Sequence, residues 1–247
     1  MLVQQTLEKL YDLRLKGMAH AFSDQAQRGE VADLSFDERF GLLVDQEWLL
    51  RQERKVHSRL KTARLKQNAC AEDIDYRQPR GLDKTVVLDL LTCSWIRAGH
   101  NLILTGATGL GKTWLACALA DRACREGLSA HYTRVPRLIH ELAMARAEGS
   151  YLKRLAKLAR MDLLILDDWG LAPLDGQGQH DLLEVVDDRA GSRSTLVTSQ
   201  LPIAKWHDMV ADPSVADALL DRLAGAAIKI QLKGGSMRKE KSKVESL

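Results

Sequence analysis

Apolar side chains recur at helical spacing over the first 67 residues of the chain. Leu7, Leu10 and Leu13 fall on one helical face. A second amphipathic stretch repeats apolar residues at steps of three and four, namely Phe36, Phe40, Leu43, Val44 and Trp48. Ser35 precedes Glu38 by three positions, which is the spacing of a capping box at the start of a helix. This pattern predicts a small helical domain over residues 1–67.

The pattern changes after this helical stretch. Residues 68–81 contain several acidic side chains, Pro79, Gly81 and little periodicity, which indicates a linker. Short apolar runs then alternate with helical stretches, and the runs are Leu102–Thr105, Ala130–Thr133, Leu163–Leu166, Thr195–Thr198 and Ile228–Leu232. Such runs are typical of parallel strands that are covered on both faces. We therefore expect a three-layer α/β/α domain with a five-stranded parallel sheet over residues 82–233, followed by a basic tail over residues 234–247.

The composition restricts the domain organisation and the class of protein but does not identify a function. With 247 residues the chain can hold one α/β core and a smaller appendage, and its net charge of +3 does not by itself indicate nucleic acid. The four cysteines, Cys70, Cys93, Cys117 and Cys124, lack CxxC spacing, which favours reduced thiols over a disulfide or a zinc site. Charged residues interrupt the N-terminal apolar positions, and no apolar run approaches the ~18 residues that span a bilayer. We expect a cytoplasmic protein with no membrane partner.

A phosphate-binding motif follows the first predicted strand of the large domain. The motif is GxxxxGK followed by threonine, and it consists of Gly106, Ala107, Thr108, Gly109, Leu110, Gly111, Lys112 and Thr113. Its glycines allow backbone N–H groups to surround an anion, and the helix that follows adds its positive end. Lys112 is predicted to bind the β- and γ-phosphates of ATP, and the Thr113 hydroxyl to bind Mg²⁺. The alternative is a glycine turn with an incidental lysine.

Two carboxylates end the apolar strand that follows, 55 positions after Lys112. In enzymes with this phosphate loop, such a strand lies beside the loop, and its first acidic residue holds the magnesium shell. We assign this role to Asp167, and we expect Asp168 to orient or deprotonate the attacking water. Without the phosphate loop, acidic residues at a strand end would serve equally well to start a turn or a helix.

Nearly the whole chain, and most clearly residues 99–239, resembles the IstB-like transposition helper ATPases, which are AAA+ proteins related to DnaC-type helicase loaders. The resemblance rests on the phosphate loop, the LLILDDWG strand end, the later strand TLVTSQLP and the stretch from DDRAGSRSTLVTSQLP to GGSMRK. It implies an AAA+ core, ATP hydrolysis that depends on DNA and on a homo-oligomer, double-stranded DNA as a ligand, and a cognate transposase as a partner. We expect the hydrolysis to be slow because of the residue at position 168. Glutamate is usual in this family at the position of Asp168, and aspartate there is shorter by one methylene.

Four further candidate residues come from the same resemblance. Thr198 and Ser199 occupy the strand end that senses the γ-phosphate in AAA+ proteins, and we expect Ser199 to take part in catalysis. Arg222 matches the arginine that is offered in trans to a neighbouring subunit. Arg238 lies where a second nucleotide-sensing arginine is expected, although the chain ends about fifteen residues after its last predicted strand, which indicates a reduced or absent helical lid.

Positive charge is concentrated in two stretches that we expect to contact DNA. Residues 51–66 hold seven basic side chains and one acidic side chain, and residues 134–160 hold seven basic and two acidic side chains. The candidates are Arg51, Arg54, Lys55, Arg59, Lys61, Arg64, Arg137, Arg146, Lys153, Arg154 and Lys157. Contacts of this kind bind DNA with little sequence preference. The alternative is that both stretches are solvated helix faces.

Three functions therefore remain open from the sequence. The first is a transposition helper that binds and remodels target DNA and recruits a transposase. The second is a loader of a replicative helicase, which would use the same ATPase core. The third is a nucleotide-gated DNA-binding scaffold with negligible hydrolysis, which the aspartate at position 168 keeps open.

Overall fold

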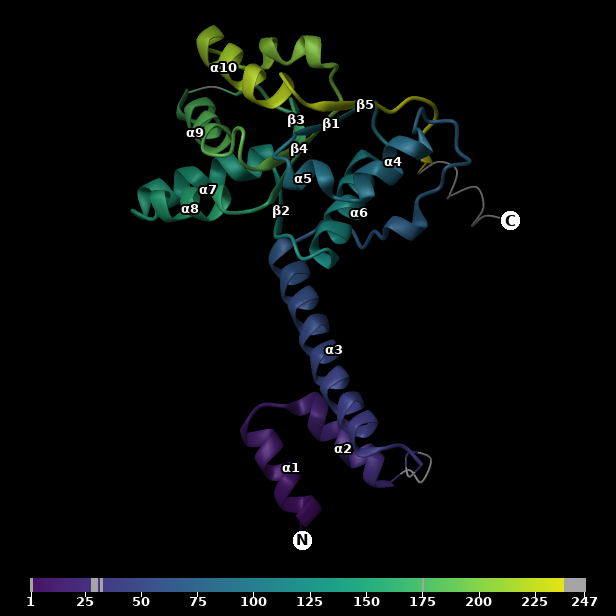
Figure 1. The fold of residues 1–247 in the computed structure, drawn as a ribbon. Coiled ribbons are helices and arrows are strands. Elements are labelled where there is room, and N and C mark those ends of the chain that lie inside the picture. Colours follow the sequence, from purple (N-terminus) through teal and green to yellow (C-terminus); the bar gives the residue numbers. More distant parts are fainter. Residues whose placement is uncertain (1, 28–30, 32, 175, 238–247) are drawn as a thin grey trace, which may run out of the picture. The chain divides into compact units, whose positions relative to one another are not determined.

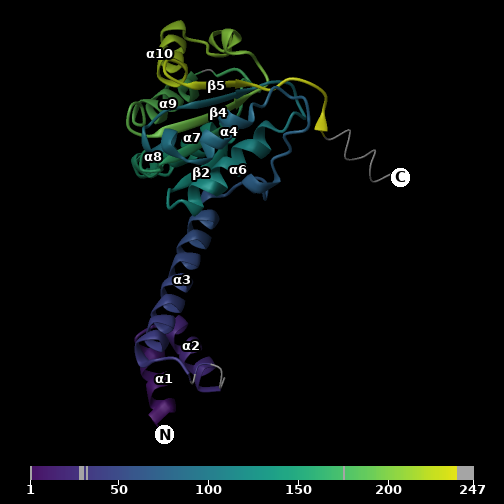
Figure 2. The same ribbon diagram turned by 45° about the vertical axis from the view of Figure 1, so that its right-hand side comes forward.

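The chain forms two compact units in the computed structural model, which describes residues 2–27, 31, 33–174 and 176–237 (Figures 1 and 2). The smaller unit comprises Met1–Ser58 and the larger one Arg59–Leu247, and the division falls within helix α3 (Phe36–Ala63). Among the described helices, none is long and apolar enough to cross a bilayer. All four cysteines are free thiols.

The smaller unit is helical, as the periodicity predicted. Helices α1 (Leu2–Asp12) and α2 (Lys16–Gln27) precede α3. The predicted capping box is present, because the Ser35 N–H donates to Glu38 Oε2 at 2.8 Å and the Glu38 N–H donates to Ser35 Oγ at 3.3 Å. The nearly buried Glu47 carboxylate of α3 accepts the N–H of Gly17 at 2.7 Å, so it caps the start of α2.

The larger unit is built on a five-stranded sheet with the order β2-β3-β4-β1-β5. The strands are β1 (Leu102–Thr105), β2 (Ala130–Arg134), β3 (Leu163–Trp169), β4 (Ser194–Ser199) and β5 (Ile228–Gln231). Every pairing is parallel, and β1 pairs with both β4 and β5. Parallel strands require crossover connections, which the intervening helices supply. The predicted five-stranded parallel sheet is therefore confirmed.

Helices cover both faces of this sheet and make it a three-layer structure (Figure 1). One core contains Leu102 and Leu104 of β1 and packs on α4 (Lys84–Leu91), α5 (Ser94–Arg97) and α6 (Lys112–Arg125). Ile103, between those leucines, belongs to the opposite core, because side chains alternate along a strand. The helices on that second side are α7 (Val135–Ala147), α8 (Tyr151–Ala159), α9 (Gly176–Asp187) and α10 (Pro213–Ala224).

The segment that its composition marked as a linker belongs to the larger unit. Ala69 and Ile74 are buried in the core beside α6, and the short 3₁₀ helix η2 (Ala71–Asp73) lies between them. The Arg80 guanidinium is also buried, and it donates to the backbone oxygens of Leu110 and Asp75. Residues 68–81 therefore form part of the wall of the larger unit, because their buried apolar side chains pack in its core.

Candidate functional site

The phosphate loop joins β1 to α6, as the motif predicted. Gly106, Gly109 and Gly111 have φ values of 141°, 88° and 86°, which L side chains rarely adopt. A Cβ at Gly106 would lie 2.4 Å from the Leu232 carbonyl oxygen, so the loop also packs too tightly there for a side chain. Helix α6 begins at Lys112, so its unpaired N–H groups face the loop and favour an anion.

The Lys112 ammonium group lies across this loop. Its Nζ atom donates to the carbonyl oxygens of Gly106 at 2.7 Å and of Ala107 at 2.9 Å. Burial lowers the pKa of Lys112, while the carboxylates of Asp167 and Asp168 act in the opposite direction. A cation is therefore held at the position where the phosphates of a nucleotide would enter the loop.

Asp167 is fully buried at the end of β3 and accepts hydrogen bonds from three hydroxyl groups. Thr113 Oγ1 donates to its Oδ1 atom at 2.9 Å, Tyr132 Oη donates to Oδ2 at 2.5 Å, and Thr198 Oγ1 also donates to Oδ1. Lys66 Nζ lies 3.8 Å from Oδ2. Burial and the Asp167 contact raise the pKa of Tyr132. The predicted metal pair, Thr113 and Asp167, is therefore in direct contact.

Asp168 follows on a distorted part of the strand. The register of β3 against β4 shifts between Leu166 and Trp169, and Asp168 has a φ of 61°. This conformation is uncommon for a residue other than glycine, and it turns the Asp168 carboxylate away from the regular strand pattern. Arg134 Nε donates to Asp168 Oδ2 at 2.7 Å. The carboxylate is thus held by an arginine at the end of the neighbouring strand.

A cavity of about 620 Å³ lies over the phosphate loop. Its walls include Lys112, Thr113 and Asp168, together with Lys66 and Arg80 from the segment that precedes the sheet. Other lining residues are Gln67, Asn68, Asp73, Asp75, Thr108, Gly109, Gly111, Trp114, Gln200 and Met237. A cavity of this size falls within the range usual for small-molecule and cofactor sites.

Gln200 is a lining residue that the sequence reasoning missed. Its Oε1 atom accepts the Thr108 hydroxyl at 2.7 Å, so a neutral side chain after β4 reaches the phosphate loop. In the sequence, Gln200 is marked only by its place in the polar tripeptide Thr198, Ser199 and Gln200 at this strand end. Ser199 instead is buried and donates to the Trp169 carbonyl oxygen at 2.8 Å. The structure therefore places Thr198 and Gln200 at the site and Ser199 away from it.

Arg222 is a predicted site residue that does not line this cavity. Arg222 forms an ion pair with Asp187 of α9 and donates to the Ala218 carbonyl oxygen at 3.1 Å. Arg238 lies outside the residues that the structure describes, as does most of the predicted basic tail.

The predicted DNA contacts lie on three helices and at one helix end. Arg51, Arg54, Lys55, Arg59 and Lys61 are on α3, Arg64 follows it, Arg137 and Arg146 are on α7, and Lys153, Arg154 and Lys157 are on α8. Several of them are in ion pairs, for example Arg146 with Asp181 at 2.5 Å and Arg137 with Glu141 at 2.9 Å. Both arginines remain exposed enough to meet an external ligand.

The chemistry of the cavity fits a nucleoside triphosphate with its magnesium ion. The loop offers backbone N–H groups and the Lys112 cation to phosphates, and Thr113 and Asp167 offer a hydroxyl and a carboxylate at its edge. Oxygen ligands of this kind, together with phosphate oxygens, are what Mg²⁺ takes in nucleotide sites. The residues present therefore suit this ligand.

Comparison with known proteins agrees with the geometry. Residues 8–245 match the family model described as IstB-like ATP binding protein. The insertion sequence ATP-binding protein y4pL of Sinorhizobium fredii is 49% identical over 97% of this chain and 98% of its own length. The ATP-binding protein of insertion sequence IS1162 from Pseudomonas fluorescens is 53% identical over 82% of this chain and 88% of its own length.

Among solved structures, DnaI aligns with a TM-score of 0.56 at 21% identity, covering 68% of this chain and 90% of that one. At this identity the likeness concerns the fold, and the shared fold is the AAA+ core. The family match extends over almost the entire chain, including both compact units. The chain therefore belongs to the family of IstB-like ATP-binding proteins.

Proposed function

We propose that this protein is an ATP-hydrolysing helper of transposition, which binds target DNA and recruits a transposase for an insertion sequence. The observation that carries the proposal is the buried Asp167, which contacts Thr113 at the edge of the phosphate-loop cavity. Relatives of this chain are named as ATP-binding proteins of insertion sequences, which supports a role of the ATPase in transposition. ATP and Mg²⁺ are the proposed cofactors.

Each residue of the cavity has a distinct task in this proposal. Lys112 would exchange its two carbonyl partners for the β- and γ-phosphates, and Thr113 and Asp167 would hold the magnesium ion. When bound there, Mg²⁺ would supply charge neutralisation for the phosphates. Asp168 orients the attacking water and accepts its proton. We propose that Gln200, which contacts Thr108 of the phosphate loop, hydrogen-bonds the γ-phosphate.

Hydrolysis by this arrangement requires a neighbouring subunit. Arg222 does not line the cavity of its own chain and pairs with Asp187 instead. A guanidinium offered to the cavity of the next subunit would stabilise the charge on the transferring phosphoryl group. We therefore propose that turnover is slow in the isolated chain and rises when subunits assemble with nucleotide on double-stranded DNA.

The ion pair between Arg134 and Asp168 favours a second candidate function. Because the carboxylate is engaged, the protein could bind ATP and DNA as a scaffold with negligible hydrolysis. A DnaC-like helicase loader is a further alternative, which would act on a replicative helicase rather than on a transposase. A pull-down with the purified transposase of the same element and with a replicative helicase separates the last alternative from the first.

Phosphate release, measured with and without duplex DNA, tests the ATPase proposal. The parent protein should hydrolyse MgATP faster with DNA, and Asp168→Asn should retain nucleotide binding but lose this turnover. Absence of DNA-stimulated turnover in the parent would leave the scaffold as the better description.

A further inference from the structure

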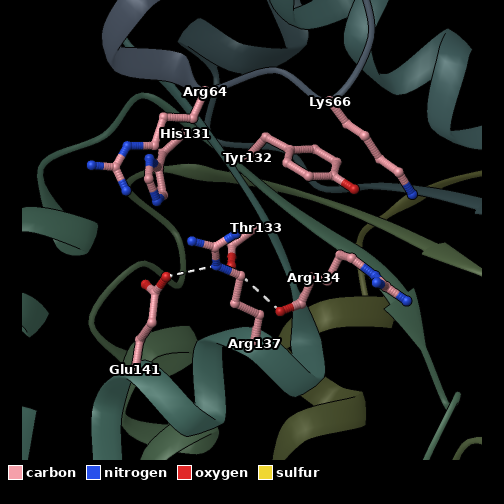
Figure 3. Close-up of a pocket in the computed structure, with 8 residues that line it drawn as sticks. All are labelled: Arg64, Lys66, His131, Tyr132, Thr133, Arg134, Arg137 and Glu141. Atoms are coloured by element: carbon pink, nitrogen blue, oxygen red, sulfur yellow. Dashed lines mark hydrogen bonds and ion pairs between the residues drawn. The ribbon is translucent and has the colours of Figure 1, made fainter. Parts of the chain in front are cut away.

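A second cavity, of about 290 Å³, lies at the carboxyl end of the edge strand β2 (Figure 3). We call it the β2 pocket. Four cationic side chains line it, Arg64, Lys66, Arg134 and Arg137, against the single carboxylate of Glu141. Arg137 Nε donates to Glu141 at 2.9 Å, so that carboxylate is already neutralised within the pocket. Arg134 and Lys66 also lie near carboxylates outside the lining, Asp168 at 2.7 Å and Asp167 at 3.8 Å. The four cations still outnumber these three carboxylates, and the remaining positive charge suits an anion.

The floor of the β2 pocket contains a buried polar group. His131 is 4% exposed, and its Nδ1 atom has no hydrogen-bond partner among the described residues. Its imidazole is hydrogen-bonded to the backbone of Thr62. Burial, followed by the nearby charges of Arg154, Lys157 and Arg64, lowers the pKa of His131 to about 4. A buried polar atom without a partner is rare in proteins and marks a place where a ligand or water binds.

The mouth of the pocket faces solvent. The side chains of Arg134 and Arg137 are 46% and 69% exposed, so they can reach a ligand that stays outside the protein. Helix α7 begins directly after Arg134 and spans Val135–Ala147. Its first turn therefore adds the positive end of a 13-residue helix to the same place.

We propose that the β2 pocket binds a phosphodiester group of double-stranded DNA. Two of its cations, Arg64 and Arg137, are among the residues that the sequence indicated as DNA contacts, and Arg154 and Lys157 of α8 lie near its His131 floor. A polymer with regularly spaced phosphates can insert one of them here while its neighbours meet the exposed basic side chains. This inference rests on the DNA binding proposed above and assigns one phosphate to a defined site.

Salt dependence of DNA binding tests the proposal. Fluorescence anisotropy of a labelled duplex would be measured over a range of KCl concentrations, with the protein loaded with Mg²⁺ and a non-hydrolysable ATP analogue. The variant is the double substitution Arg64→Gln with Arg137→Gln, and both side chains are exposed, so the fold should be retained. The matched control is Arg97→Gln on α5, at the amino end of the sheet.

The double variant should lower the slope of log affinity against log salt by about one for each DNA-bound subunit, because one phosphate contact is lost. Arg97→Gln should keep the parent slope. If the double variant also keeps it while the parent binds DNA, the β2 pocket is not a DNA site, although the proposed function stands. If the parent binds no DNA, the proposed function itself fails.

A titration with inorganic phosphate is the second test of the proposal. Free phosphate at millimolar concentration is titrated calorimetrically into the protein loaded with the ATP analogue. We expect no binding that is lost in the Arg64→Gln, Arg137→Gln double variant. Such binding, together with an unchanged DNA salt slope, would assign the pocket to free phosphate and overturn the proposal.

Discussion

The ion pair between Arg134 and Asp168 offers the sharpest test of how this site works. Arg134 Nε donates to Asp168 Oδ2 at 2.7 Å, and Asp168 is the carboxylate to which we assign the proton from water. An arginine on a carboxylate stabilises its charged form and occupies one of its oxygens. Replacement of Arg134 by glutamine should therefore release Asp168 and raise the rate of ATP hydrolysis in the absence of DNA.

The size of the effect follows from the exposure of the two side chains. Arg134 is 46% exposed and Asp168 is 21% exposed, so solvent screens the pair. Ion pairs of this kind are worth about 0.2–1 kcal/mol. If the whole of that energy must be given up before hydrolysis, its removal changes the rate by at most about fivefold, because ~1.4 kcal/mol corresponds to tenfold.

Phosphate release at saturating MgATP without DNA is the measurement. Arg134→Gln should show a rise of up to about fivefold, whereas Arg134→Lys keeps a cation near Asp168 and should stay close to the parent. DNA should also stimulate Arg134→Gln less than the parent, since the restraint is already absent. A rate equal to or below that of the parent would refute the reasoning and indicate that Arg134 assists hydrolysis instead.

The remaining predictions concern binding, assembly and stability. Lys112→Ala should abolish ATP binding in calorimetry, and nucleotide-dependent assembly on DNA that persists in this variant would contradict control by the phosphate loop. Arg222→Ala should bind nucleotide as the parent does but lose turnover, and mixing with Lys112→Ala subunits, which keep the arginine, should restore part of it. Tyr132→Phe removes one hydrogen bond to the buried Asp167 carboxylate and should lower the free energy of unfolding in urea by about 1.5–3 kcal/mol. The pKa of His131 is about 4 in the folded chain and about 6.5 in the unfolded chain, so the unfolded chain binds this proton more readily. The free energy of unfolding should therefore fall by up to about 3 kcal/mol as the pH drops from 6.5 to 4. His131→Gln should flatten that dependence.

The parts of the fold that were predictable are those encoded in local patterns. Apolar runs such as Leu163–Leu166 identified strands because both faces of a parallel sheet are buried. The phosphate loop was recognisable because its glycine and lysine spacing is tied to one backbone geometry. The contact between Thr113 and Asp167 followed from the same geometry, although 54 positions separate the two residues.

Features that depend on packing between distant segments were not predictable. Residues 68–81 have the composition of a linker, yet Ala69 and Ile74 pack beside α6, and two small apolar contacts leave no periodic signal. At the end of β4, Thr198 and Ser199 differ by one position, so they point to opposite faces of the sheet. The sheet face that each side chain occupies depends on strand register, which the sequence does not show. For this reason the sequence alone could not predict that Thr198 contacts Asp167 and that Ser199 contacts the Trp169 carbonyl oxygen.

Strand β2 contributes side chains to the β2 pocket and to the carboxylates beside the phosphate loop. It pairs with β3 such that Arg134 lies opposite Asp167, and its alternate side chains Tyr132 and Arg134 contact Asp167 and Asp168. Both side chains also line the β2 pocket. An anion in that pocket would compete with Asp168 for Arg134, so the same event that fixes DNA would free the carboxylate that ATP hydrolysis needs. Release of Asp168 would then need no change in strand pairing, because Arg134 already lines the β2 pocket while it contacts Asp168.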